Sequence, residues 1–127
     1  MGKIKVLIVD DDMKFAKNLG SFLRIMGYET NEIGTGESAL KLIEDDKPDI
    51  LLCDLKLPDI DGKEIVRKAK EISPKTILFI ISAYVDSSIE ERFEKLGLYA
   101  FIYKPVLFDD VIALFKKAIS DRNLTPS

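Results

Sequence analysis

The sequence predicts an α/β domain, a doubly wound sheet of five parallel strands with helices on both faces. Three observations predict this class. The chain has 127 residues, 46% of them hydrophobic, which suits a single compact core. Short apolar runs alternate with segments whose apolar residues recur at helical spacing. The first, third and fourth runs are apolar nearly throughout, as in parallel strands buried on both faces.

The five apolar runs are predicted as strands because they are short and rich in β-branched residues. They span residues 4–9, 28–33, 50–53, 76–81 and 100–103. The first helix is predicted from an apolar face between Phe15 and Met26, which Gly27 closes. The second is predicted from an apolar face at residues 39–43 that stops before Pro48. The remaining helices are expected at residues 63–72, 87–96 and 108–121.

Composition narrows the possible functions. The net charge of −3, from 19 basic and 22 acidic residues, provides no basic field, so we expect no direct nucleic-acid binding. No apolar run approaches the roughly 20 residues that span a bilayer, and the N-terminus lacks signal-peptide organisation. We therefore expect a cytoplasmic protein without a membrane segment. Histidine is absent, which excludes imidazole ligands, and Cys53 is expected to be a buried apolar residue.

Residues 1–122 are expected to form one domain, followed by a polar tail or the start of a linker at residues 123–127. No internal repeat or low-complexity segment interrupts the pattern. The sequence therefore predicts a single domain.

Acidic residues follow two of the predicted strands. Asp10 and Asp11 come directly after the first strand, and Asp54 follows the third. In open parallel sheets the ligand lies outside the carboxyl ends of the strands, and the common order 2-1-3-4-5 makes strands 1 and 3 neighbours. Three carboxylates would then converge, and their mutual repulsion would cost stability unless a cation were bound. Oxygen ligands favour Mg²⁺, for which Mn²⁺ can substitute.

Two further residues fall on the same edge of the predicted sheet. Ser82 ends the fourth strand with a hydroxyl, and Lys104 follows the fifth strand with a positive charge. This set suits phosphoryl transfer onto a carboxylate, with Asp54 as the acceptor and with Lys104 and Ser82 holding phosphoryl oxygens.

Taken singly, other polar residues in these loops have ordinary structural roles. Asp12 is expected to cap the first helix. Asp59 and Asp61 are expected to be turn residues beside Gly62. Phe101, considered alone, is expected to be a core residue.

The motifs VDDD, CDLKLPDIDG, ISA and YKP occur in this order, each at the end of a predicted strand. With them the sequence resembles a response-regulator receiver domain, the phosphoacceptor unit of two-component signalling. The resemblance covers essentially the whole chain and implies a flavodoxin-like (βα)5 fold. It implies that Asp54 is phosphorylated, and that Asp10, Asp11, Asp54 and the backbone carbonyl of Lys56 hold Mg²⁺.

The resemblance also assigns the remaining site residues. Ser82 would be the switch hydroxyl, Phe101 the switch aromatic and Lys104 the lysine that contacts the phosphoryl group. The bond from Lys104 to Pro105 would be cis, as the family usually holds it. Lys56 and Tyr84 would occupy variable positions that tune the lifetime of the phosphoryl group.

The function implied is a phosphorylation-activated switch rather than an enzyme, although the domain would assist its own phosphoryl transfer and slow dephosphorylation. The donor would be a sensor histidine kinase or a phosphotransfer protein, because this chain has no histidine. Phosphorylation would change the surface at residues 87–121, through which the domain would control a downstream effector or output domain or form a homodimer.

Three other functions fit parts of the sequence. A haloacid-dehalogenase-like phosphohydrolase would use Asp10 as its nucleophile, but Lys14 stands where that family commonly has Thr, and the chain is too short for a substrate cap. A flavin-binding electron carrier would place a phosphate where the carboxylates repel it. A receiver-like interaction module that never accepts phosphate would not need the complete set of acids and lysine.

Overall fold

The computed structural model describes residues 2–122 and contains five strands and five helices in strict alternation. The strands are β1 (Lys5–Val9), β2 (Glu29–Ile33), β3 (Ile50–Asp54), β4 (Ile77–Ser82) and β5 (Ala100–Tyr103). The helices are α1 (Met13–Ile25), α2 (Gly36–Asp46), α3 (Gly62–Ile72), α4 (Ser87–Lys95) and α5 (Phe108–Asp121). The tail expected at residues 123–127 lies outside the described residues.

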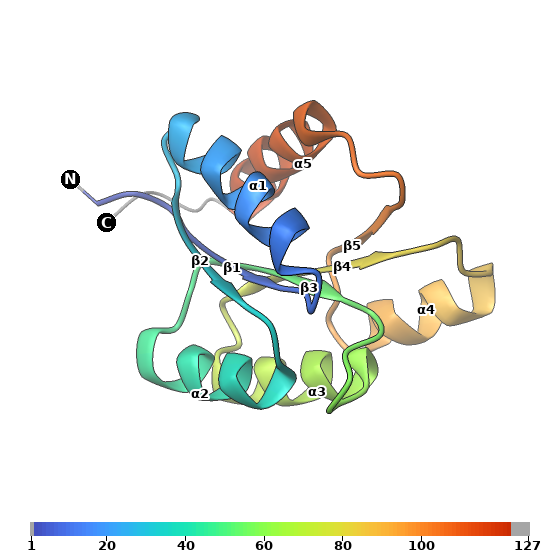
Figure 1. Ribbon diagram of the computed structural model, residues 1–127. Helices are drawn as coiled ribbons and strands as arrows, with labels where there is room; N and C mark the ends of the chain where they lie inside the picture. The colour runs from blue at the N-terminus through green and yellow to red at the C-terminus, as the bar shows by residue number, and fades with distance from the viewer. Residues whose placement is uncertain (1, 123–127) are drawn as a thin grey trace.

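All strand pairs are parallel, and the sheet order is β2-β1-β3-β4-β5. The predicted fold class and strand order are therefore confirmed. Helices α1 and α5 cover one face of the sheet, and α2, α3 and α4 cover the other (Figure 1).

Alternation along each strand supplies both layers of the core. In β1, Val6 and Ile8 pack beneath α1 and α5, whereas Leu7 and Val9 pack against the opposite helices. Every residue of β3 and β4 is buried, as their continuous apolar sequences predict for strands covered on both faces. The core thus holds the carboxyl ends of β1, β3 and β4 in a fixed arrangement.

Helix ends carry the side chains that such ends require. The side chain of Asp12 accepts a hydrogen bond from the amide of Phe15 at the start of α1, which confirms its expected capping role. Thr35 caps α2 and Asp61 caps α3 in the same way. Gly27 adopts a φ of 102° just after α1, a conformation that favours glycine.

Two strands include the polar residue that follows the predicted apolar run. The pairing of β3 continues to Asp54, which is opposite Ile81, and the pairing of β4 continues to Ser82, which is opposite Tyr103. Both polar residues are thereby fixed by strand pairing at the edge of the core. None of the helices within residues 2–122 is long and apolar enough to cross a membrane.

Candidate functional site

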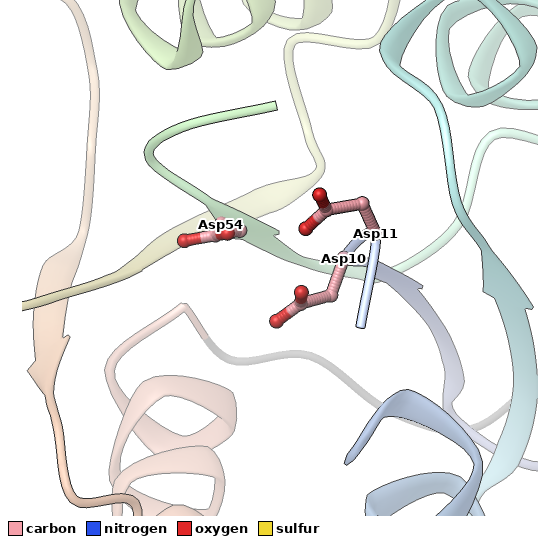
Figure 2. A group of neighbouring side chains, drawn as sticks. All are labelled: Asp10, Asp11 and Asp54. Atoms are coloured by element: carbon pink, nitrogen blue, oxygen red, sulfur yellow. The ribbon is translucent and has the colours of Figure 1, made fainter. Parts of the chain in front are cut away.

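Three carboxylates meet at the carboxyl edge of the sheet. Parallel pairing of β1 with β3 places Val9 opposite Cys53, so that Asp10 and Asp54 leave adjacent strands side by side. Asp11 completes the group, and an oxygen from each carboxylate lies within 4.8 Å of the other two. Figure 2 shows the three side chains gathered at the ends of the two strands. The convergence predicted from sequence is present.

The three acids differ in their exposure to water. Asp10 is 3% exposed and Asp54 is 7% exposed, whereas Asp11 is exposed. Burial raises the pKa of Asp10, and the negative charge of Asp54 raises it further. The amide of Asp12, which donates to Oδ1 of Asp10 at 2.9 Å, acts in the opposite direction. Ionised carboxylates at this edge therefore repel one another in a partly dehydrated setting, and a divalent cation would relieve the repulsion.

A lysine faces the same carboxylates. The Nζ of Lys104 lies 3.6 Å from Oδ1 of Asp54, close enough for an ion pair but longer than a hydrogen bond. Its backbone N–H donates to the carbonyl of Ser82 at 2.8 Å, and its bond to Pro105 is cis. Ser82 is itself buried at the end of β4. The structure therefore brings Asp10, Asp11, Asp54, Ser82 and Lys104 to one edge.

Comparison with known proteins gives the family. The model of the response regulator receiver domain matches residues 6–116. The chain belongs to this family. It is 31% identical over 113 residues to sporulation initiation phosphotransferase F of Bacillus subtilis, covering 89% of this chain and 91% of that protein.

Two further comparisons agree with this assignment. The chain is 32% identical over 119 residues to the transcriptional regulatory protein ZraR of Escherichia coli K12, covering 92% of this chain and 26% of that protein. A receiver domain protein (CheY-like) from Methanospirillum hungatei JF-1 superposes with a TM-score of 0.88 at 28% identity, covering 94% of this chain and 95% of that one.

A receiver domain is a phosphorylation-activated signalling switch, and receiver domains bind Mg²⁺ at an acidic pocket. Members of the receiver domain family generally act as switches rather than as enzymes. The comparisons do not support the phosphohydrolase with Asp10 as nucleophile.

The aromatic residue expected to act in the switch lies away from the acids, on the face of β5 that packs against α4. The half-buried ring of Phe101 makes a T-shaped contact with Phe93, at a centroid distance of 5.1 Å, and stacks on Tyr103, at 5.8 Å. The hydroxyl of Tyr103 donates to Oε2 of Glu90 on α4 at 2.6 Å. Burial, and then this hydrogen bond, raise the pKa of Tyr103 to about 12.

Sequence reasoning missed Tyr103 and Glu90 in this receiver domain. Strand alternation indicates that Tyr103 shares a face with Phe101, but nothing local to the sequence shows that Glu90 reaches it. The contact that Asp59 makes with α2 was also not predicted from the sequence. Asp59 lies in a turn as expected, yet its carboxylate accepts two backbone hydrogen bonds from the start of α2, more than 20 residues away.

Proposed function

We propose that this receiver domain accepts a phosphoryl group on Asp54 from a phosphohistidine of a sensor kinase or a phosphotransfer protein. The observation that carries the proposal is the position of Asp54, a buried carboxylate at the end of a central strand, with two other acids and Lys104 beside it. A carboxylate so placed can act as a nucleophile toward a ligand at the sheet edge.

The donor set fits a hard divalent cation. Asp10, Asp11 and Asp54 supply carboxylate oxygens that lie close together, and the backbone carbonyl of Lys56 would complete the protein ligands for Mg²⁺. Mn²⁺ would substitute, since it also prefers oxygen ligands. When bound, the ion would neutralise negative charge on the carboxylates and on the phosphoryl oxygens.

In the proposed transfer, a carboxylate oxygen of Asp54 forms a bond to phosphorus while the phosphorus–nitrogen bond of the donor histidine breaks. The electron pair of that bond leaves with the imidazole, which then takes a proton. Lys104 and Ser82 would each hold a phosphoryl oxygen, the first through its charge and the second through its hydroxyl. Because Lys104 lies beyond hydrogen-bond distance of Asp54, its ammonium group is free to bind the incoming oxygen.

The change on phosphorylation would pass through Ser82 and Phe101 to the surface formed by α4, β5 and α5. That surface would bind a downstream effector, an output domain or a second copy of the chain. The domain would turn over no separate substrate. It would assist its own phosphorylation and its own dephosphorylation, which would be slow, and Lys56 and Tyr84 would tune the lifetime of the phosphoryl group. It would work in the cytoplasm, where such kinases deliver phosphoryl groups, and residues 123–127 would lead into any further segment.

The test is chemical labelling of the acceptor. Acetyl phosphate with Mg²⁺ should add one hydroxylamine-labile phosphoryl group to the wild type, detected by intact-protein mass spectrometry. Asp54→Asn should abolish the mass increase because an amide is a poor nucleophile. Asp12→Asn is the matched control, since it makes the same change at a helix cap and should be labelled normally. An undiminished mass increase in Asp54→Asn would refute the assignment.

A further inference from the structure

The loop between β3 and α3 is tied to the start of α2 by one side chain. The carboxylate of Asp59 accepts the backbone N–H of Gly36 at 2.9 Å through Oδ1 and that of Glu37 at 3.0 Å through Oδ2. Both amides belong to the first turn of a helix, where N–H groups have no partner within the helix. The two hydrogen bonds lower the pKa of Asp59, so the carboxylate is charged at neutral pH.

A second contact reinforces this tie. A Cβ built on Gly36 would lie only 1.8 Å from Cγ2 of Ile60, so Ile60 packs directly on the glycine backbone. Adjacent residues of the loop therefore engage the same turn of α2, one through hydrogen bonds and one through packing. Helices α2 and α3 lie side by side on this face of the sheet (Figure 1).

The loop itself is short and internally closed. The amide of Gly62 donates to the carbonyl of Leu55 at 3.1 Å, and Lys56 pairs with Asp61 in an antiparallel bridge. These bonds hold the two ends of the loop together. Leu55 and Leu57 pack against the core, and Asp59 and Ile60 attach the tip of the loop to α2. Lys56 therefore lies on a loop that is closed at its base by the bridge to Asp61 and attached to α2 at its tip.

The start of α2 is in turn connected to the other side of the acidic site. The amide of Asp10 donates to the carbonyl of Ile33 at 3.0 Å, just before the turn that leads into α2. The segment from the end of β2 to the start of α2 therefore contacts both parts of the chain that carry the acids, one through Ile33 and the other through Gly36 and Glu37.

We propose that Asp59 is a positioning residue for the metal site, because it anchors the loop that carries Lys56 to the start of α2, three residues after Ile33, which holds the backbone of Asp10. The inference rests on the proposed function, since the loop matters to the cation through the Lys56 carbonyl. Groups that orient metal ligands from outside the coordination shell commonly change metal affinity by about 10-fold to 100-fold when they are removed.

The experiment compares three variants of the full chain by isothermal titration calorimetry with Mg²⁺. Asp59→Ala removes both hydrogen bonds and should weaken Mg²⁺ binding by about tenfold. Asp59→Asn keeps one acceptor oxygen and should lose less. Thr35→Ala is the matched control, because the hydroxyl of Thr35 caps the same helix through the amide of Ser38, whereas the amides that Asp59 binds are those of Gly36 and Glu37. It should lower the urea midpoint of the metal-free protein while leaving Mg²⁺ affinity unchanged.

Backbone amide NMR spectra of the metal-free proteins provide a readout independent of the cation. The signals of Gly36, Glu37 and residues 55–61 should shift in Asp59→Ala, whereas those of residues 55–61 should stay in place in Thr35→Ala. Wild-type Mg²⁺ affinity in Asp59→Ala would overturn the positioning role alone. An equal loss of Mg²⁺ affinity in Thr35→Ala would also overturn the positioning role, because it would trace the effect to the stability of α2. An equal loss in Asp59→Asn would overturn it as well, because it would trace the effect to the charge of Asp59. Absence of Mg²⁺ binding by the wild type would overturn the metal site as well.

Discussion

Replacing Asp10 by Asn should stabilise the metal-free protein at neutral pH. Asp10 is the most deeply buried of the three clustered acids, and burial and the charge of Asp54 both raise its pKa. The Asn side chain has nearly the same shape, and its oxygen can still accept the amide of Asp12. The substitution therefore removes one buried charge and leaves the packing intact.

The size of the effect follows from the spacing of the carboxylates. One oxygen from each carboxylate lies within 4.8 Å of the others, and two like charges at that distance repel by about 3.5 kcal/mol at an effective dielectric constant of about 20. Solvent screens the exposed Asp11 more strongly, and the ammonium group of Lys104 offsets part of the repulsion at Asp10. We therefore expect Asp10→Asn to raise the free energy of unfolding by about 1–3 kcal/mol, which is large for a single substitution.

The assay is urea unfolding followed by circular dichroism in EDTA at pH 7. Asp12→Asn is the matched control, because it removes a neighbouring charge while Asn still caps α1, and it should change stability by less than about 0.5 kcal/mol. Mg²⁺ at about 1,000 times its Kd should reverse the order of wild type and Asp10→Asn, since a ligand at that concentration stabilises the protein that binds it by about 4.1 kcal/mol.

The pH dependence gives a second check on the same reasoning. The ordinary pKa of Asp10 is 3.8, and its folded-state pKa is higher, so between these values the folded protein binds more protons than the unfolded chain. Wild-type stability should therefore fall as pH rises through this window, and the advantage of Asp10→Asn should appear in the same window. Equal or lower stability of Asp10→Asn in EDTA at pH 7 would show that the acids do not repel one another as argued.

Three further predictions concern the switch and the packing. Ser82→Ala should remain phosphorylatable but lose the NMR shifts that beryllofluoride induces in residues 87–121, and a full wild-type shift pattern would exclude Ser82 as the switch. Gly36→Ala should destabilise the protein by about 1–3 kcal/mol in urea unfolding because its methyl group would overlap Ile60, and adding Ile60→Ala should recover part of the loss. Glu90→Gln should lower the phenol pKa of Tyr103 from about 12 toward its ordinary value of 10, followed by NMR titration of the ring, and an unchanged pKa would mean that burial alone sets it.

The residues at the carboxyl ends of the strands could be predicted from sequence. The apolar pattern of each strand is a local property, and the strand order follows from the topology of the fold class. Once the fold order was known, Asp10, Asp54, Ser82 and Lys104 had to share an edge, and the structure places them there. The apolar runs end one residue before Asp54 and Ser82, and the structure includes both polar residues in their strands. Backbone pairing continues regardless of side-chain polarity when a neighbouring strand supplies the partner.

Contacts between elements could not be predicted in the same way. The hydrogen bonds of Asp59 join a turn to a helix 22 and 23 residues earlier, and that of Tyr103 joins a strand to a helix 13 residues earlier. Each depends on how a helix packs on the sheet and on the rotamer of a long or polar side chain. The residues around Asp59 correctly predict a turn, but they do not indicate which backbone amides of another element lie near its carboxylate.

The distribution of buried polar groups shows why the acidic edge is best understood as a functional feature. Away from that edge, buried polar side chains have protein partners. Thr30 bonds to the carbonyl of Gly20, and Ser73 and Thr76 bond to each other. At the edge, Asp10 accepts the amide of Asp12 but is also buried beside like charge, which costs stability. Natural sequences satisfy local rules nearly everywhere and break them where chemistry requires it. The cluster of Asp10, Asp11 and Asp54 therefore lies where a bound cation would offset the repulsion between the carboxylates.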